Sequence, residues 1–352
     1  MYVNPYIKNT YRVKDKNDRQ GYIRLDMNEN PEGLPEEFVR EVLKKIDSNF
    51  LAAYPRKETL LGMIAEREGI KRQNITLTNG SDEGMRLVFE TFTRPGGRVV
   101  SVMPTFGMYQ VYASMFGVQL DGVPFKDDFS IEVEDIVSSI NQDTDLVVLL
   151  NPNSPIGIEF TEEECDKIIL RAKEAGAFVL IDEAYYPFGV DSKINYFKEY
   201  PHVMILRTFS KICSLAALRV GYIIGDEEYI RYVENAQSTY NVNSVGILFA
   251  EELLKRNDIV ENLKEKIDEG REYLNQNLEK SGYQYFGSKG NYVLIKPRKN
   301  PQFVADEMKK EKILIKKYER GILSDWIRIT LGNKDIMEIF WKTFLRIEEP
   351  NV

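Results

Sequence analysis

The strongest constraint on the fold is a series of short, continuously apolar segments that alternate with helical patterns between residues 75 and 224. Segment 146–150, with the sequence LVVLL, has no alternating polar residues, which is typical of strands buried on both faces. Segment 161–175 begins with Thr161 and Glu164 in capping-box spacing, which predicts a helix. The expected strands are 75–78, 98–103, 146–150, 177–181, 203–206 and 220–224, and the expected helices are 82–92, 109–116 and 161–175. This order predicts an α/β fold with a mainly parallel sheet covered by helices on both faces.

The pattern changes after residue 245. A long charged helix is expected over about 245–280, and it is followed by strands at 292–295, 313–315 and 326–330 and helices at 303–310 and 335–345. The first 30 residues are polar and are expected to form an arm that packs on this second region. A chain of 352 residues exceeds one typical core, so two domains are expected. We predict an arm with part of the small domain in residues 1–40, a large ligand-binding domain in 41–245, and a connecting helix with a small α+β domain in 246–352.

Composition excludes several classes of function. The net charge of −8, without a dense basic stripe, argues against a nucleic-acid partner. Two cysteines cannot form a disulfide framework or a cysteine zinc site, and the single histidine, His202, has no nucleophile motif beside it, so no metal site is expected. No apolar run reaches the length of a membrane span or a signal peptide, so a cytoplasmic location is the expectation. If the chain is an enzyme, its general base is expected to be Lys, Asp, Glu or Tyr.

Polar residues follow several of the expected strands, and ligands of open α/β sheets bind beyond the carboxyl ends of strands. Gly80, Ser81 and Asp82 come after the strand at 75–78 and open a helix, where free N–H groups could hold a phosphate. An ordinary helix cap is the alternative. The chain has no dinucleotide-binding GxGxxG motif and no Walker A loop.

The strand at 203–206 is followed by Lys211, and the strand at 177–181 by Asp182 and Tyr185. A lysine amine can bond an aldehyde and also move protons, although any one of 47 basic residues is more often a surface charge. Asp182 could cap a helix or bind a metal or a ribose, but in a pyridoxal phosphate (PLP) site a carboxylate pairs with the protonated pyridine nitrogen. Tyr185, three residues later, could reach the phenolic oxygen of the ring.

Three further residues suit the same cofactor. Ser210 and Arg219 could complete phosphate binding, and a guanidinium can do so with two hydrogen bonds. Phe106, after the strand at 98–103, could stack on a planar ring, although a core position is the alternative.

Taken in order, these motifs resemble those of fold-type I PLP-dependent aminotransferases, and histidinol-phosphate aminotransferases are the nearest subfamily. The motifs are NENP at 28–31, YP at 54–55, GSDE at 80–83, PTFG at 104–107, NPNSPIG at 151–157, DEAY at 182–185, TFSK at 208–211, LRVG at 218–221 and IRIT at 327–330. The resemblance implies a large domain with a mainly parallel seven-stranded sheet, a smaller α+β domain, PLP as cofactor and a homodimer. It also implies amino transfer between glutamate or 2-oxoglutarate and a small amino compound, with or without a phosphate group.

The resemblance implies a role for each matched residue around the cofactor. Lys211 would form the Schiff base and carry the proton, Asp182 would pair with the ring nitrogen, and Tyr185 would contact the ring oxygen. The remaining cofactor contacts implied are a stacking Phe106 and, around the phosphate, Ser81, Asp82, Ser210 and Arg219.

The resemblance also implies contacts for the substrate and across the dimer. Tyr54 would reach the PLP phosphate of the neighbouring subunit. Arg328 would bind the α-carboxylate of an amino-acid substrate such as glutamate. Tyr6 and Asn28 match arm positions that meet the substrate, and Lys316 matches the position that holds its phosphate end.

Two departures from the family pattern bear on the chemistry. Ser154 stands where relatives carry an Asn that bonds the ring oxygen, which leaves open whether a water or Asn153 replaces that contact. Lys316 stands where an Arg is usual, and a lysine holds a phosphate only as a point charge. The substrate stays undetermined, and a PLP-dependent decarboxylase of a phosphorylated amino acid is the alternative because the same fold supports both reactions. A PLP-binding regulatory protein would need an additional DNA-binding module.

Overall fold

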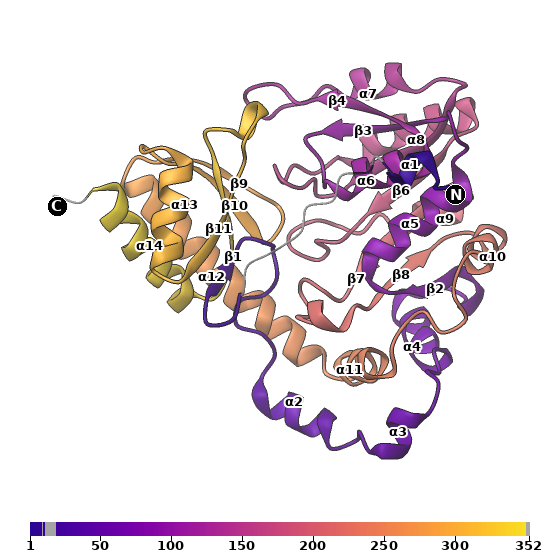
Figure 1. Cartoon of the computed structure of the whole chain (residues 1–352), viewed down its shortest axis with the longest axis horizontal. Coiled ribbons are helices and arrows are strands. Elements are labelled where there is room, and N and C mark those ends of the chain that lie inside the picture. The colour runs from indigo at the N-terminus through magenta and orange to yellow at the C-terminus, as the bar shows by residue number, and fades with distance from the viewer. Residues whose placement is uncertain (9, 11–18, 350–352) are drawn as a thin grey trace.

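The computed structural model describes residues 1–8, 10 and 19–349. Two sheets organise these residues (Figure 1). The larger has seven strands in the order β2-β8-β7-β6-β5-β3-β4, and the smaller has five in the order β1-β11-β12-β10-β9. The α/β fold class expected from the sequence is confirmed.

The large sheet is mainly parallel. Its strands are β2 (Ile75–Thr78), β3 (Arg98–Met103), β4 (Gln119–Pro124), β5 (Thr144–Leu150), β6 (Phe178–Asp182), β7 (Val203–Thr208) and β8 (Gly221–Ile224). Only β8 runs antiparallel to its neighbours, β2 and β7. The sequence did not predict β4, an edge strand whose largely exposed residues QLDGVP lack an apolar run.

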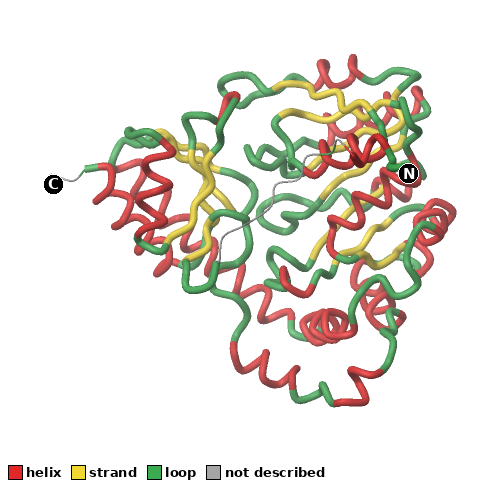
Figure 2. Tube along the Cα trace, viewed as in Figure 1, coloured by secondary structure: helices red, strands yellow, loops and turns green. Residues whose placement is uncertain are grey.

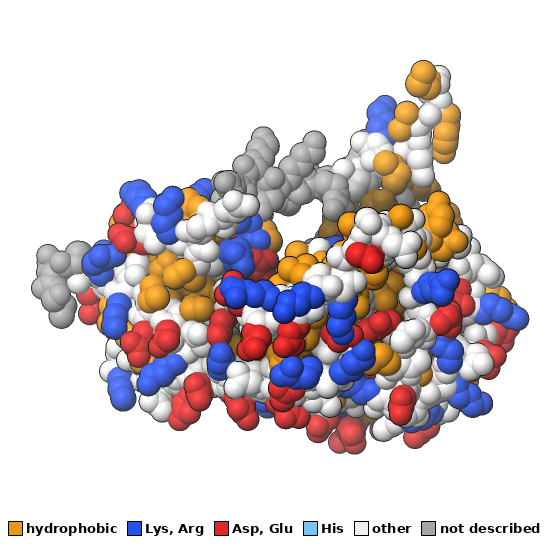
Figure 3. Space-filling view, turned by 90° about the horizontal axis from the view of Figure 1, so that it is seen from below, with side chains coloured by type: hydrophobic (Ala, Val, Ile, Leu, Met, Phe, Trp, Pro, Cys, Tyr) orange, Lys and Arg blue, Asp and Glu red, His pale blue; other side chains and the backbone are white. Residues whose placement is uncertain are grey.

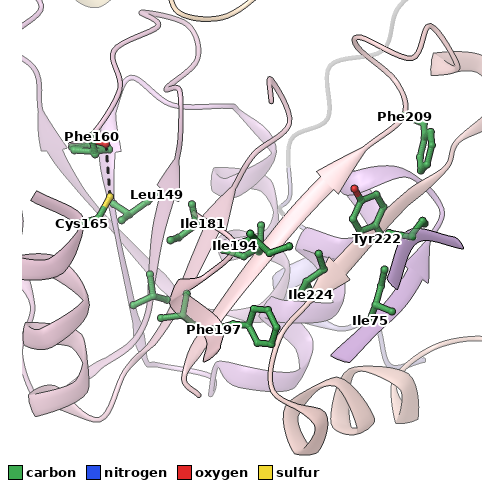
Figure 4. Close-up of a cluster of buried hydrophobic side chains, with 14 of the residues drawn as sticks. Ile75, Leu149, Phe160, Cys165, Ile181, Ile194, Phe197, Phe209, Tyr222 and Ile224 are labelled. Carbon is green, nitrogen blue, oxygen red and sulfur yellow. Dashed lines mark hydrogen bonds between the residues drawn. The ribbon is translucent and has the colours of Figure 1, made fainter. Parts of the chain in front are cut away.

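Helices cover both faces of the large sheet (Figure 2). Leu146 and Val148 of β5 pack in one apolar cluster, with α5 and α6, whereas Val147 and Leu149 pack in another, with α4 and α8. Figure 4 shows part of the second cluster, where Leu149 and Ile181 extend from β5 and β6. The helices on this sheet are α4 (Glu58–Glu68), α5 (Gly80–Phe92), α6 (Met108–Phe116), α7 (Val133–Ser139), α8 (Glu162–Ala175), α9 (Tyr196–Glu199), α10 (Glu227–Asn235) and α11 (Ser244–Leu254). The capping box predicted for α8 is present.

The small sheet includes the N-terminal arm. Its strands are β1 (Ile23–Leu25), β9 (Gln284–Gly287), β10 (Tyr292–Lys296), β11 (Ile313–Lys317) and β12 (Ile327–Thr330), with helices α12 (Asn257–Lys280), α13 (Pro301–Lys310) and α14 (Lys334–Glu348). β1 pairs in parallel with β11, so the expectation that the arm packs on this region is confirmed. Ile327 and Ile329 are buried in the core beneath this sheet, and Arg328 therefore faces the opposite side.

The single helix expected over 245–280 is wrong. The segment forms two helices, α11 and α12, and Arg256 between them has non-helical angles (φ −125°, ψ 64°). Each helix has a long apolar stripe. The helical pattern of the sequence therefore looked continuous, although the helix is interrupted at the polar residues Lys255 and Arg256. Figure 1 shows α12 running from beside α11 to the small sheet.

Shorter elements complete the described chain. They are α1 (Pro5–Lys8), α2 (Glu36–Leu43), α3 (Ser48–Ala52) and the 3₁₀ turns at Arg72–Asn74, Ala216–Leu218 and Gly321–Leu323. None of the described helices is long and apolar enough to cross a membrane. Acidic and basic side chains are interspersed on the face shown in Figure 3. The domain boundaries at residues 40 and 245 stay a prediction.

Candidate active site

Eight of the predicted residues line one cavity of about 220 Å³. The cavity lies where β5, β6 and β7 end, because Leu150, Asp182 and Thr208 are the last residues of those strands. The predicted residues in its wall are Ser81, Asp82, Phe106, Asp182, Tyr185, Ser210, Lys211 and Arg219. Segments far apart in the sequence thus meet at the edge of the sheet where ligands of such folds bind.

One end of the cavity is shaped to hold an anion. Gly80 begins α5 with φ +72°, a backbone conformation that other residues rarely adopt, and a Cβ there would lie 2.5 Å from Nη2 of Arg219 and displace the guanidinium. The Arg219 guanidinium donates from Nη1 to the Ser210 hydroxyl at 3.4 Å and to the Ala216 carbonyl at 3.2 Å. The N–H groups at the start of α5 and the guanidinium therefore favour a phosphate.

Lys211 supplies an amine to the cavity. Its Nζ donates to the Met27 carbonyl at 2.9 Å and has no carboxylate partner among the described residues. Desolvation lowers the pKa of Lys211, and the guanidiniums of Arg328 and Arg219 lower it further, against the opposing effects of Tyr185 and Glu29. A lowered pKa increases the fraction of free amine, which is the nucleophilic form.

Asp182 is fully buried beside this amine. Its Oδ2 accepts a hydrogen bond from the Tyr109 hydroxyl at 2.6 Å, and its Oδ1 accepts one from the Ala184 amide at 3.0 Å. Burial raises the pKa of Asp182 to about 6, although these hydrogen bonds oppose the shift. Sequence analysis did not single out Tyr109. Its only distinguishing feature in the sequence is its position three residues after Phe106, close to the end of a strand.

We expect the apoprotein to lose stability relative to an Asp182→Asn variant as pH rises from about 4 to about 7. The folded-state pKa of Asp182, about 6, exceeds the reference value of 3.8, so the folded protein binds this proton more tightly than the unfolded chain does. The resulting stabilisation is complete below the unfolded pKa and disappears as pH rises through about 6, for a total of roughly 3 kcal/mol. Urea unfolding of both apoproteins across this range measures the difference, and parallel stability curves would contradict the expectation.

The Tyr185 hydroxyl is held from two sides. It accepts a hydrogen bond from Asn28 Nδ2 at 2.9 Å and donates one to Ser154 Oγ at 3.2 Å. Ser154 and Asn28 thus adjoin the cavity through Tyr185. Asn153 does not replace Ser154 in this contact, because its side chain bonds the Pro104 carbonyl and the Ile156 amide instead.

Two basic side chains of the small sheet, Lys316 and Arg328, lie near the Tyr185 hydroxyl and its partners. Lys316 and Arg328 are opposite each other in the β11–β12 register, so their side chains share a face. Arg328 donates to the Asp26 carbonyl at 2.9 Å and to Ser154 at 3.5 Å, and its buried Nε has no hydrogen-bond partner. Desolvation lowers the pKa of Lys316, and Arg328 lowers it further. Neither cation has an ion pair among the described residues, which suits an anionic ligand.

The structure does not bring Tyr54 or Tyr6 to the cavity of their own chain. The Tyr54 side chain is 74% exposed and stacks on Tyr240 with ring centroids 4.3 Å apart. The Tyr6 ring lies against Gly117, beyond the far end of α6, because the short helix α1 packs there. Neither tyrosine can therefore make its implied contact, with the cofactor phosphate or with the substrate, in the cavity of its own chain.

The residues of the cavity fit PLP. An amine without a carboxylate partner, a buried carboxylate, an exposed aromatic ring at Phe106 and an anion cradle match the aldehyde, pyridine nitrogen, ring face and phosphate of that cofactor. The close approach of the Arg219 guanidinium to Gly80, at the start of α5, is the sharpest part of this fit.

Comparison with known proteins agrees with the geometry. The family model described as aminotransferase class I and II matches residues 20–343. The chain is 31% identical to histidinol-phosphate aminotransferase 1 of Oceanobacillus iheyensis over 353 residues, which cover 99% of this chain and 97% of the relative. It is 33% identical to the histidinol-phosphate aminotransferase of Brachyspira hyodysenteriae, with 96% and 94% covered.

Solved structures share the fold. Histidinol-phosphate aminotransferase of Sinorhizobium meliloti, in complex with pyridoxal-5'-phosphate, superposes with a TM-score of 0.88 at 21% identity and covers 99% of this chain and 98% of that one. L-threonine-O-3-phosphate decarboxylase of Porphyromonas gingivalis gives a TM-score of 0.77 at 18% identity, with 91% and 98% covered. At such low identity these likenesses establish the fold alone.

Proposed function

Because the chain belongs to the class I and II aminotransferase family, we propose that it transfers an amino group between glutamate or 2-oxoglutarate and a small amino compound that carries a phosphate. The chain is a PLP-dependent aminotransferase, and the amino compound is the part proposed. Lys211, Asp182 and Arg219 in one cavity are the observation that carries the proposal.

The residues around the cofactor have complementary roles in this proposal. Bound PLP supplies an electron sink for the carbanion that forms when the substrate loses its α-proton. Lys211 would hold the cofactor through Nζ. Once the substrate amine displaces Nζ from that bond, the free Nζ would accept the α-proton and return it. The Asp182 carboxylate would accept a hydrogen bond from the protonated ring nitrogen. The Tyr185 hydroxyl has one proton, which it now donates to Ser154, and it would donate that proton to the ring oxygen instead.

The other cofactor contacts hold the ring and phosphate in place. Phe106 would stack on the ring, and Ser154 would border the ring oxygen beside the Tyr185 hydroxyl. The proposed phosphate contacts are Ser81, Ser210, Arg219 and the backbone N–H of Asp82 in the first turn of α5. These donors require little rearrangement when the ligand binds, which favours tight binding.

The substrate contacts are proposed on the small-sheet side of the cavity. Arg328 would bind the α-carboxylate of glutamate, which would give its buried Nε a hydrogen-bond partner. Lys316, beside it on the same face, binds the phosphate of the amino compound. Asn28 borders the substrate through its bond to Tyr185. The printed names of the relatives, histidinol-phosphate aminotransferases, support a phosphorylated substrate.

A substrate panel tests the proposal. The PLP form is mixed with glutamate and with phosphorylated and unphosphorylated amines, and the absorbance change to the amine form of the cofactor is followed. We expect glutamate and a phosphorylated amine to give the change. The proposal is wrong if no amino acid converts the cofactor.

The decarboxylase alternative is not proposed. Its support is a structural likeness at 18% identity, which shows a shared fold and no more. Carbon dioxide release without formation of the amine form, in the same panel, would restore it.

We expect Lys316→Ala to raise the KM of a phosphorylated amine by roughly ten- to a hundred-fold, the range for one hydrogen bond to a charged group. The KM of the matching unphosphorylated amine should stay within about twofold, because Lys316 has no group to bind there. Lys317→Ala is the matched control, since Lys317 neighbours Lys316 in β11 and pairs with Glu319. Equal effects of the two variants on both amines would contradict a phosphate contact at Lys316.

The proposal includes a homodimer. Tyr54 is exposed and removed from the cavity of its own chain, which supports a contact with the PLP phosphate of the neighbouring subunit. Tyr6 is likewise exposed on the arm and is proposed to meet the substrate only in that assembly. The cytoplasmic location stays a prediction.

A further inference from the structure

Helix α6 brings two tyrosine hydroxyls to two carboxylates of the cavity. Tyr109 and Tyr112 are three residues apart and therefore share a face of the helix. The Tyr109 hydroxyl donates to Asp182 Oδ2 at 2.6 Å, and the Tyr112 hydroxyl donates to Asp82 Oδ1 at 2.9 Å. The first contact lies at the proposed nitrogen end of the ring, and the second at the proposed phosphate end.

We propose that Tyr109 is a positioning residue that fixes the orientation and the charge of Asp182, and through it the proton on the cofactor's ring nitrogen. This inference rests on the proposed pairing of Asp182 with that nitrogen. Tyr109 does not line the cavity and acts only through Asp182.

The geometry supports a positioning role. Tyr109 and Asp182 are both fully buried, so water does not compete for their hydrogen bond. The Ala184 amide holds the other carboxylate oxygen, so the carboxylate is fixed at both oxygens. The Tyr109 ring contacts Phe106 edge-on, with centroids 6.5 Å apart, and is anchored independently of its hydroxyl.

The electrostatics give the hydroxyl a second effect. Burial raises the pKa of Tyr109 well above its ordinary value, and the charge of Asp182 raises it further, so the hydroxyl stays protonated and donates. The Tyr109 hydrogen bond is the strongest of the influences that lower the pKa of Asp182 against burial. Without it the carboxylate is more basic and draws the proton away from the ring nitrogen, which weakens the electron sink.

Nitrogen-15 NMR of the holoenzyme loaded with ¹⁵N-labelled PLP tests the inference. In Tyr109→Phe, which keeps the ring and removes the hydroxyl, we expect the nitrogen signal to move toward its unprotonated position. We also expect kcat for amino transfer to fall by roughly ten- to a hundred-fold while KM changes little. Tyr112→Phe, the matched loss of a hydroxyl from the same helix face, should leave the nitrogen signal in place.

Three results would overturn the inference. An unchanged signal in Tyr109→Phe, with a shifted signal in Asp182→Asn, would show that Tyr109 has no positioning role, although Asp182 keeps its role. An unchanged signal in Asp182→Asn would show that Asp182 does not pair with the ring nitrogen. Equal shifts in the two tyrosine variants would indicate repacking of α6.

A second variant tests the inference if Tyr109→Phe does not fold. A fluorinated tyrosine at position 109 is a stronger hydrogen-bond donor of similar shape, and it should move the nitrogen signal in the direction opposite to phenylalanine.

Discussion

Replacing Lys211 with alanine is expected to lower amino transfer from glutamate by at least about 10²–10⁴-fold, the usual contribution of one general base. The variant loses the only amine in the wall of the cavity, among the described residues, that could bond the cofactor and carry the proton. Single-turnover reaction with glutamate measures the loss. The spectrum of the loaded variant should lack the absorbance of the lysine-bound cofactor.

Two comparisons test whether activity depends on the covalent bond and proton transfer of Lys211 or only on its positive charge. Lys211→Arg keeps the positive charge but cannot form the covalent bond, so it should be as inactive as the alanine variant. Small primary amines added to Lys211→Ala should restore part of the proton transfer. Substantial activity in Lys211→Arg would contradict the assigned role.

Replacing Arg328 with alanine is expected to lower kcat/KM for glutamate by roughly 30- to 5,000-fold, because truncating one partner of a buried charge pair costs about 2–5 kcal/mol. Arg328 is 9% exposed and its Nε has no hydrogen-bond partner, so a substrate carboxylate would complete its bonding. Steady-state kinetics with glutamate and with an amine that lacks a carboxylate measures the difference. Only the reaction with glutamate should fall by this amount.

The controls for Arg328 use other basic side chains. Arg328→Lys retains a point charge without the planar fork and should recover only part of the loss. Arg320→Ala removes an exposed arginine of the loop between β11 and β12 and should leave the kinetics unchanged. A similar loss with both substrates in Arg328→Ala would indicate a damaged cavity and contradict a carboxylate contact.

The large sheet could be predicted because its strands carry local information. Runs such as Val203–Leu206 are apolar without interruption, and the polar residues that follow them, such as Lys211, come next in the chain. Since parallel strands end at one edge of a sheet, these residues could be grouped before their distances were known.

Other parts of the site depend on contacts that no local pattern encodes. Asn28 and Tyr185 are 157 residues apart, and Lys211 bonds the Met27 carbonyl, a backbone atom that every residue type supplies. Tyr109 appears in the sequence as an ordinary aromatic in an apolar helix, and only its distance to Asp182 distinguishes it. The break at Arg256 was also missed, because an apolar stripe on each side resembles one long helix.

Hydrogen bonds beside the cavity join the arm and β12 to the side of the large sheet. They run from Asn28 to Tyr185, from Asn30 to Ser214, from Arg328 to Ser154, and from Lys211 to the Met27 carbonyl. Leu150 and Ile212 of the large-sheet side also pack in one apolar cluster with Leu25 and Ile329 of the small sheet. Separating the two sides therefore exposes buried apolar surface and also exchanges these hydrogen bonds for bonds to water. A ligand that forms hydrogen bonds with Lys211, Tyr185 and Arg328 would replace bonds that also join the two sides. The same side chains would therefore serve both ligand binding and the contact between the two sheets.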